Sequence, residues 1–414
     1  MKRVFIGFLC LLFGISGCSM TNTIDNSLPN KLHTASSLPK NYEANSIIWH
    51  EDDMLLYHSR DGLYAYQPSK GMTRKLLSEE LVEREWLIND WNSGYYGSSP
   101  DRSKYILLSS KRKTLEIREI NTDNHILSLN SENILEAGWF DNENVFFTTM
   151  YSLYIVNIKS GEQVQVTEDS TQIFAEAGKD STYISWAKNV NKIGDKLYYN
   201  GVRSAPDYIS SVIYCADRSG EQKQIEKAIL LKAVDNQRFI YLKQSKDEYE
   251  GTFLYNTLTG ESTLIFKGDL RNTGGTFLTN DSKIAFVTPK TDNVPHYGVI
   301  FDPVTLQYQR FEIPVQILSN TNKFSCIRNF MGAFKKNGVY IFLFNGEYVS
   351  LESNKSGYTN YMYNSKTNSL TEIVGYEGKM GVDMKISPSG EYIAVINYNL
   401  FDVIRSDSIL NPQT

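Results

Sequence analysis

The chain has 414 residues, with 42 basic and 47 acidic side chains and a formal net charge of −5. This length suffices for one large β domain or two ordinary domains. The negative charge and the lack of any Lys/Arg-rich run argue against nucleic acid as a partner. Tyrosine (27) and phenylalanine (20) are abundant while proline (11) is sparse, a composition that favours strands over helices.

The N-terminus combines a basic start with a short apolar run. Lys2 and Arg3 precede the apolar residues 4–13, which are too few to span a bilayer. The following stretch, Ile15-Ser16-Gly17-Cys18, resembles the lipobox of bacterial lipoprotein signal peptides. The resemblance implies cleavage before Cys18, acylation of that cysteine, and a mature protein anchored outside the cytoplasmic membrane, facing the periplasm or the cell surface. In the alternative interpretation, the segment is an ordinary secretory signal and Cys18 is incidental.

The remaining chain is expected to form one domain. With residues 1–17 as the signal peptide, residues 18–30 are polar and turn-rich without periodicity, which is typical of a flexible tether. Strand-like patterns fill residues 31–405, and residues 406–414 form a short tail. No interdomain linker interrupts these patterns, so a single domain is the simplest interpretation.

One short pattern recurs from end to end: an aromatic or apolar pair, Asn or Asp, two or three polar residues, and usually Gly. Copies begin at Tyr64, Tyr154, Tyr214, Leu254, Ile300 and Met362, with a weaker one at Ile120. An Asx side chain can accept a hydrogen bond from the backbone two residues on, and Gly or Asn tolerates the positive φ that closes a tight loop. The pattern therefore predicts a β-hairpin at each copy.

A second pattern places a polar turn before an aliphatic strand. It reads Ile386-Ser387-Pro388-Ser389-Gly390 before the strand 391–395, and weaker copies occur at 98–107, 277–286 and 139–147. These residues resemble the TolB-type β-propeller repeat, a WD-like repeat whose signature is Ser-Pro-Asp-Gly followed by Lys or Arg and an apolar strand. The first copy matches closely, whereas the others lack the glycine.

Together the two patterns define a unit of four strands that recurs roughly every 40 to 60 residues, the spacing of propeller blades. We therefore predict an all-β fold, a single β-propeller of four-stranded antiparallel blades, with eight blades favoured and seven left open. The expected units are 47–77, 84–130, 131–168, 171–226, 228–267, 268–314, 315–374 and 375–405. Because the last unit shows only three strands, residues around Lys31 to Ser36 are expected to complete it beside Phe401 to Ile404.

Residues suited to chemistry are few. His50-Glu51-Asp52-Asp53, together with His58, is the densest group of potential ligands or acid–base residues, although a solvated polar turn is the preferred interpretation of the run. Trp91, Tyr95 and Tyr96 lie in a glycine-containing stretch that indicates a loop with exposed rings. The histidines are placed irregularly against the repeat, which argues against a shared metal site. No Gly-x-Ser-x-Gly, phosphate-loop or Cys-x-x-Cys motif occurs, so no catalytic set, cofactor or metal is predicted.

Two functional hypotheses follow. The first is a noncatalytic, membrane-anchored, extracytoplasmic propeller that binds a protein or peptide of the cell envelope on one rim, where loops of unequal length gather. The second is an envelope glycan-binding protein or glycan-acting enzyme with its site at the mouth of the propeller channel. The candidate ligand-binding residues for that site are His50, His58, Trp91, Tyr95 and Tyr96.

Overall fold

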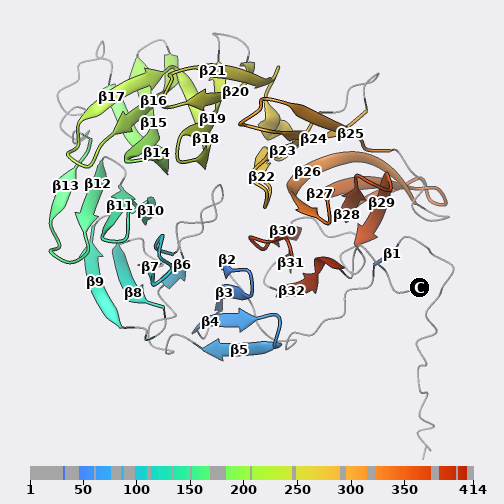
Figure 1. Cartoon of the computed structure of the whole chain (residues 1–414), viewed down its shortest axis with the longest axis horizontal. Coiled ribbons are helices and arrows are strands. Elements are labelled where there is room, and N and C mark those ends of the chain that lie inside the picture. Colours follow the sequence, from blue (N-terminus) through green and yellow to red (C-terminus); the bar gives the residue numbers. More distant parts are fainter. Residues whose placement is uncertain are drawn as a thin grey trace, which may run out of the picture.

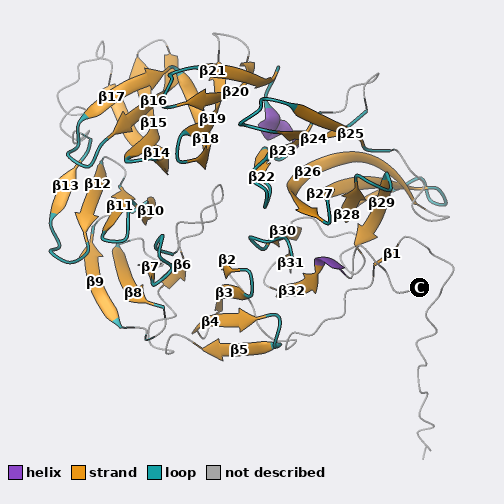
Figure 2. Ribbon diagram, in the orientation of Figure 1, coloured by secondary structure: helices purple, strands orange, loops and turns teal. Residues whose placement is uncertain are grey.

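The computed structural model is a ring of eight β-sheets that follow one another in chain order (Figure 1). Strands make up nearly all of the regular structure in the part of the chain that is described (Figure 2). The structure describes residues 31–32, 46–59, 62–75, 85–87, 98–109, 113–120, 122, 124–131, 134–149, 152–167, 183–205, 208–244, 249–289, 295–314, 322–373, 382–397 and 400–407. The chain is an eight-bladed β-propeller, which confirms the predicted all-β class and decides for eight blades over seven.

The first six blades each contain four antiparallel strands, ordered from the centre of the ring outward. Blade 1 contains β2 (Ser46–Glu51), β3 (Met54–Ser59), β4 (Gly62–Gln67) and β5 (Met72–Lys75). Blade 2 contains β6 (Glu85–Leu87), β7 (Lys104–Ser109), β8 (Thr114–Glu119) and β9 (His125–Asn130). Blade 3 contains β10 (Glu136–Trp139), β11 (Asn144–Thr148), β12 (Leu153–Asn157) and β13 (Gln163–Gln165). Blade 4 contains β14 (Tyr183–Ile193), β15 (Lys196–Ala205), β16 (Tyr208–Ala216) and β17 (Gln222–Glu226). Blade 5 contains β18 (Ala228–Asp235), β19 (Arg238–Gln244), β20 (Tyr249–Asn256) and β21 (Ser262–Phe266). Blade 6 contains β22 (Thr276–Leu278), β23 (Ile284–Val287), β24 (Tyr297–Phe301) and β25 (Tyr308–Glu312). A short 3-10 helix, η1 (Leu270–Thr273), precedes β22.

The last two blades differ from this four-stranded plan, because blade 7 has a fifth strand and blade 8 has three strands among the described residues. Blade 7 contains β26 (Asn322–Lys336), β27 (Val339–Ser350), β28 (Ser356–Asn364) and β29 (Ser369–Ile373), and blade 8 contains β30 (Val382–Ile386), β31 (Tyr392–Asn397) and β32 (Leu400–Arg405). The blades correspond one for one to the eight units predicted from the sequence.

The N-terminal strand pairs with a different blade from the one predicted. The strand β1 (Lys31–Leu32) pairs in parallel with β29, with Lys31 opposite Glu372 and Leu32 opposite Ile373. The prediction that this segment completes the last blade beside Phe401 to Ile404 is therefore wrong. It is a fifth strand of blade 7, and blade 8 has three strands among the described residues. The outer edges of β29 and β32 both offer backbone groups for pairing, so a strand count alone cannot choose between them.

Blades 1 and 8 close the ring through side chains rather than through a shared sheet. Trp49 Nε1 donates to the carbonyl oxygen of Lys385 at 2.9 Å, and Lys385 Nζ donates to the carbonyl oxygen of Ile47 at 2.9 Å. The ring of Trp49 stacks on that of Tyr392 with centroids 6.2 Å apart. Ala394 of β31 packs into the apolar cluster of blade 1.

Neighbouring blades pack face to face, so the middle strands are buried on both sides. Every residue of β11 is buried, and one apolar cluster joins Ile117 of blade 2 to Trp139 and Val145 of blade 3. The cluster between blades 6 and 7 is aromatic, with Phe277 of blade 6 and Phe330 of blade 7 meeting edge to face at a centroid distance of 5.1 Å. Because each such side chain contributes about 1.5 to 3 kcal/mol on burial, packing between blades is the main stabilising interaction of the ring.

The hairpin order gives the ring two different faces. The turns from first to second strand and from third to fourth strand lie on one face, named here the turn face; residues 140–143 and 158–162 are examples from blade 3. The connections from second to third strand, and from one blade to the next, lie on the opposite face, named here the loop face; residues 351–355 of blade 7 are an example.

Candidate functional site

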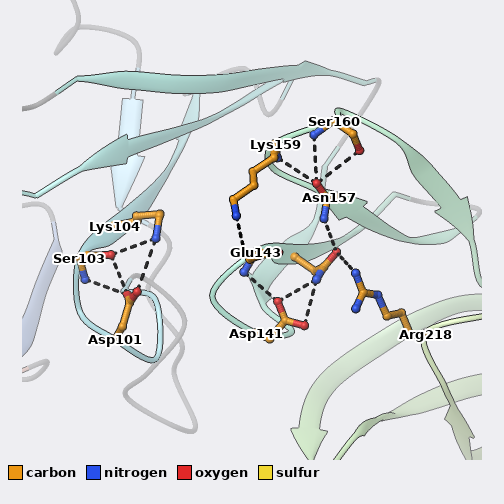
Figure 3. Close-up of polar contacts among 10 residues, drawn as sticks. Asp101, Ser103, Lys104, Asp141, Glu143, Asn157, Lys159, Ser160 and Arg218 are labelled. Carbon is orange, nitrogen blue, oxygen red and sulfur yellow. Dashed lines mark hydrogen bonds and ion pairs between the residues drawn. The ribbon is translucent and has the colours of Figure 1, made fainter.

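The turn face carries a layer of linked polar side chains (Figure 3). Asn157 Oδ1 accepts hydrogen bonds from the backbone N–H groups of Lys159 and Ser160, both at 3.0 Å, as the Asx pattern predicts. Asn144 Oδ1 accepts from Asn157 Nδ2 at 3.3 Å and from Arg218 Nη2 of blade 4 at 3.1 Å. These groups bond one another across blades, so this layer fixes the turns in place.

The Ser-Pro-Asp turn of blade 2 is built in the same way. Asp101 Oδ1 accepts from the backbone N–H of Ser103 at 3.0 Å and from Ser99 Oγ at 2.5 Å. Burial opposes ionisation, but the hydrogen bonds from Ser99 and Ser103 and the charge of Lys104 outweigh it and lower the pKa of Asp101 to about 2. A carboxylate that stays ionised at neutral pH suits a turn and not a general acid.

His50 lies where blade 1 meets the start of this turn. Its side chain is buried, and Nδ1 lies 2.8 Å from the hydroxyl oxygen of Ser98. Burial lowers the pKa of His50, the nearby Glu51 carboxylate raises it, and Arg102 lowers it, with a net shift below 6.5. His50 is thus a neutral, hydrogen-bonded residue between two blades.

Acidification is expected to destabilise the fold through His50. Because its pKa is lowered in the folded state, the unfolded chain binds a proton more readily. The stability present above pH 6.5 is therefore lost as pH falls toward the folded-state pKa. Thermal unfolding at about pH 7.5 and about pH 5.5 should show a larger loss of Tm for the wild type than for His50→Asn, which cannot titrate. Equal losses would show that other groups cause the pH dependence.

The residues proposed for a channel-mouth site are not brought together by the hairpin of blade 1. His58 pairs with Ser46 at the loop-face end of β3, whereas His50 lies near the turn-face end of β2. Four residues of strand separate the two positions along β2, which is roughly 13 Å. Trp91, Tyr95 and Tyr96 lie outside the described residues, as does Cys18.

The other histidines of the described chain also lie apart. His296 is buried between blades 6 and 7, where Nδ1 donates to the carbonyl oxygen of Thr288 at 2.9 Å and Nε2 accepts from the N–H of Ile327 at 3.0 Å. His125 contacts Ser128 in the outer strand of blade 2. Among the described residues no group of three or more His, Cys, Asp or Glu side chains is placed to hold a metal ion.

A row of hydrogen-bonded polar side chains, named here the polar seam, joins the inner strands of blades 3, 4 and 5 and was not predicted from the sequence. Glu136 of β10 is half-buried and accepts from the backbone N–H groups of Asn189 at 3.0 Å and Val190 at 3.1 Å. Burial raises the pKa of Glu136, and the two N–H groups oppose that rise. Asn189 is held in the left-handed region at φ 51°, where β14 bulges. The carboxylate therefore fixes an irregular stretch of blade 4 against blade 3.

The seam continues into blade 5. Asn200 Nδ2 donates to the carbonyl oxygen of Leu230 at 3.1 Å, and the N–H of Leu230 donates back to Asn200 Oδ1 at 2.8 Å. Asn191 Oδ1 accepts from the N–H of Ala233 at 3.0 Å. The sequence signal for this seam is Lys188-Asn189-Val190-Asn191-Lys192, a polar run inside the predicted unit 171–226.

Two blades extend beyond the ring on the loop face. In blade 4, β17 pairs only with residues 213–216 of β16, while the pairing of β16 with β15 continues to Tyr208. In blade 7, β29 pairs only with residues 360–364 of β28, while β28 pairs with β27 as far as Ser356. At about 3.3 Å per residue, the two sheets rise roughly 13 to 16 Å past their outer strands.

The extension of blade 7 presents polar and apolar groups side by side. Arg328 Nε donates to Glu347 Oε2 at 3.0 Å, and the thiol of Cys326 lies 3.6 Å from the same oxygen. The hydrogen bond from Arg328 lowers the pKa of Glu347 and outweighs burial, which raises it. At the tip, Leu351 is 51% exposed. We take this raised sheet, with its counterpart in blade 4, as the candidate binding site.

Neither cysteine of the described chain, Cys215 or Cys326, is in a disulfide bond. Cys215 is buried in the cluster between blades 4 and 5, where it acts as a small core residue. Cys326 is half-buried on blade 7. In the described part of the chain no helix has the length and hydropathy needed to cross a membrane.

No protein-family model matches the sequence, and no curated protein matches it either. Solved propeller structures do resemble the fold. The Dos1 propeller has a TM-score of 0.52 at 9% identity over 91% of this chain and 95% of that chain. A putative dipeptidyl aminopeptidase IV from Bacteroides ovatus has a TM-score of 0.51 at 11% identity over 91% of this chain.

This chain spans 60% of the length of that peptidase structure. Oligogalacturonate lyase in complex with manganese has a TM-score of 0.48 at 11% identity, over 89% of this chain and 100% of that chain. At these identities the resemblance to the Dos1 propeller and to the peptidase structure establishes the β-propeller fold alone.

Proposed function

We propose that this chain is a noncatalytic β-propeller, held at the outer side of a bacterial cytoplasmic or outer membrane by a lipid on Cys18, that binds an envelope protein on its loop face. The observation that carries the binding role is the extension of blades 4 and 7 past the ring on that face. Raised sheets on a rigid ring offer preorganised surfaces, which lower the entropic cost of binding.

The chemistry of the blade 7 extension suits a protein partner. An exposed leucine at its tip and an Arg328–Glu347 ion pair on its face combine an apolar anchor with polar contacts, as protein interfaces do. Tyr348 lies against Gly357, where a Cβ would come within 2.5 Å of the ring, so the aromatic group is held flat on the sheet. Aromatic and arginine side chains contribute strongly to such interfaces.

A photoreactive residue at the tip tests the assignment of the face. With p-benzoylphenylalanine in place of Leu351, ultraviolet irradiation of intact cells should yield one protein adduct of defined mass. The same residue in place of Lys159, on the turn face, should not yield that adduct. Leu351→Asp should reduce recovery of the partner with the purified chain by about tenfold, because it puts a charge at an apolar contact. Adducts from the turn face only, or capture of glycan instead of protein, would refute the proposal.

The anchor has a separate test. Cells fed labelled fatty acid should incorporate the label into the wild-type chain and not into Cys18→Ser. The substituted chain should remain unprocessed or leave the membrane fraction, because a single unacylated segment gives no firm attachment. Label in Cys18→Ser would show that the lipobox interpretation is wrong, independently of the partner.

A further inference from the structure

The turn face of blades 5 and 6 carries exposed apolar side chains where the other blades carry polar ones. Leu258 is 72% exposed and Val304 is 70% exposed, each at the second position after the Asx residue of its turn. The corresponding positions in blades 3, 4 and 7 are Lys159, Ser219 and Lys366. Since the scaffold of these five turns is the same, the apolar residues at this position distinguish the two adjacent blades 5 and 6 from blades 3, 4 and 7. Met72 of blade 1, 61% exposed, lies at a different position, at the start of an outer strand.

Hydrogen bonds fix the backbone at both positions. The N–H of Leu258 donates to Asn256 Oδ1 at 2.9 Å, and the N–H of Val304 donates to Asp302 Oδ1 at 2.8 Å. The outer strands of the two blades are also joined, because the hydroxyl of Tyr308 donates to the carbonyl oxygen of Ile265 at 3.0 Å. The two apolar tips thus form one fixed edge.

The chain enters the ring from this same side. The strand β29 starts at the turn face and runs toward the loop face, and β1 is parallel to it. Lys31, at the start of β1, therefore lies at the turn-face end of this pair of strands in blade 7. From Cys18 to Lys31 the chain can span at most roughly 45 Å. A lipid on Cys18 would therefore place the bilayer within reach of the turn face.

Charge also favours a neutral lipid surface as the occupant. The basic groups nearest the apolar tips are already paired, Lys283 with Asp302 and Arg238 with Asp235. Little cationic charge is left there to attract anionic headgroups, so contact rests on the apolar side chains.

We propose that Leu258 and Val304 rest in the interfacial layer of the membrane that carries the anchor, with the loop face pointing away from it. This inference depends on the proposed acylation of Cys18. It assigns the two faces different roles, the turn face to lipid and the loop face to the partner.

Depth-dependent quenching tests the contact. The acylated full chain carries Cys215→Ala and Cys326→Ser, so that a single introduced cysteine can be labelled. An environment-sensitive dye is attached at Thr259→Cys on the turn face or at Ser353→Cys on the loop face. The labelled chain is reconstituted in phosphatidylcholine vesicles that contain doxyl lipids. Quenching at residue 259 is expected to exceed quenching at residue 353 by about fivefold and to be unchanged by salt, because the contact is apolar. Leu258→Ser with Val304→Ser should remove the difference, whereas Lys159→Ser with Lys366→Ser at the matching turns should preserve it.

The outcomes separate the two claims. A chain that lacks the acyl group and does not float with vesicles refutes the anchor. An anchored chain with equal quenching at both labels, or with quenching that only the lysine substitutions reduce, overturns the membrane contact alone. If the dye at residue 259 becomes more shielded from water as the protein density rises, but not as the doxyl lipid content rises, the apolar edge contacts a second copy of the chain. That result would also overturn the proposed membrane contact.

Discussion

Replacing Gly274 with alanine is expected to lower the free energy of unfolding by about 3 kcal/mol or more. Gly274 ends the helix η1 at φ 98°, a left-handed conformation that strains a residue with a Cβ. The added Cβ would also lie 2.5 Å from the backbone nitrogen and oxygen of Phe330 in β26. Backbone atoms cannot rotate away as a side chain can, so blades 6 and 7 would have to separate locally.

The neighbouring glycine provides a matched control. Gly275 has a similar φ of 90°, but a Cβ added there would meet no atom within 4 Å beyond its own chain neighbours. Gly275→Ala should therefore show the conformational cost alone, about 1 kcal/mol. Chemical denaturation of both variants measures the difference. Similar losses of stability in the two would mean that the contact with Phe330 relaxes easily.

The turn chemistry was predictable because it is local. The side chain of Asn157 accepts from the two following N–H groups and Gly161 adopts φ 74°, as the sequence pattern indicates. Seven such turns, together with the Ser-Pro turn that precedes the strand 391–395, indicate the eight repeating units. These features depend on residues within one turn, so no long-range contact is needed to infer them.

Features that depend on strand length and register were not predictable in the same way. The fourth and seventh units were long, but bulges break the alternation of β26 at three places, so excess length could not be assigned to strand or loop. His50 and His58 are close in sequence, yet antiparallel pairing puts them at opposite ends of their hairpin. The seam at Glu136 joins residues more than fifty positions apart, so the polar run 188–192 marks one side of the contact but does not identify its partner.

The contact that closes the ring is expected to matter more than the N-terminal strand. Trp49→Ala removes the hydrogen bond to Lys385 and the stacking on Tyr392 at the junction of blades 1 and 8. Because Trp49 is half-buried, the expected loss is about 2 to 3 kcal/mol, less than for a fully buried tryptophan. Trp49→Phe keeps an aromatic ring and should lose only about 1 kcal/mol, the contribution of the hydrogen bond.

A chain in which Cys18 is joined directly to His33 provides the contrasting variant. It loses β1, whose pairing with β29 involves only Lys31 and Leu32, so its free energy of unfolding should fall by about 1 kcal/mol at most. Denaturation curves of the three variants rank the contacts. If losing β1 destabilises the ring more than Trp49→Ala does, the N-terminal segment has a larger part in closure than its two-residue pairing explains. The Trp49 junction would then be secondary, and the edge of blade 7 would be the place where the ring is secured.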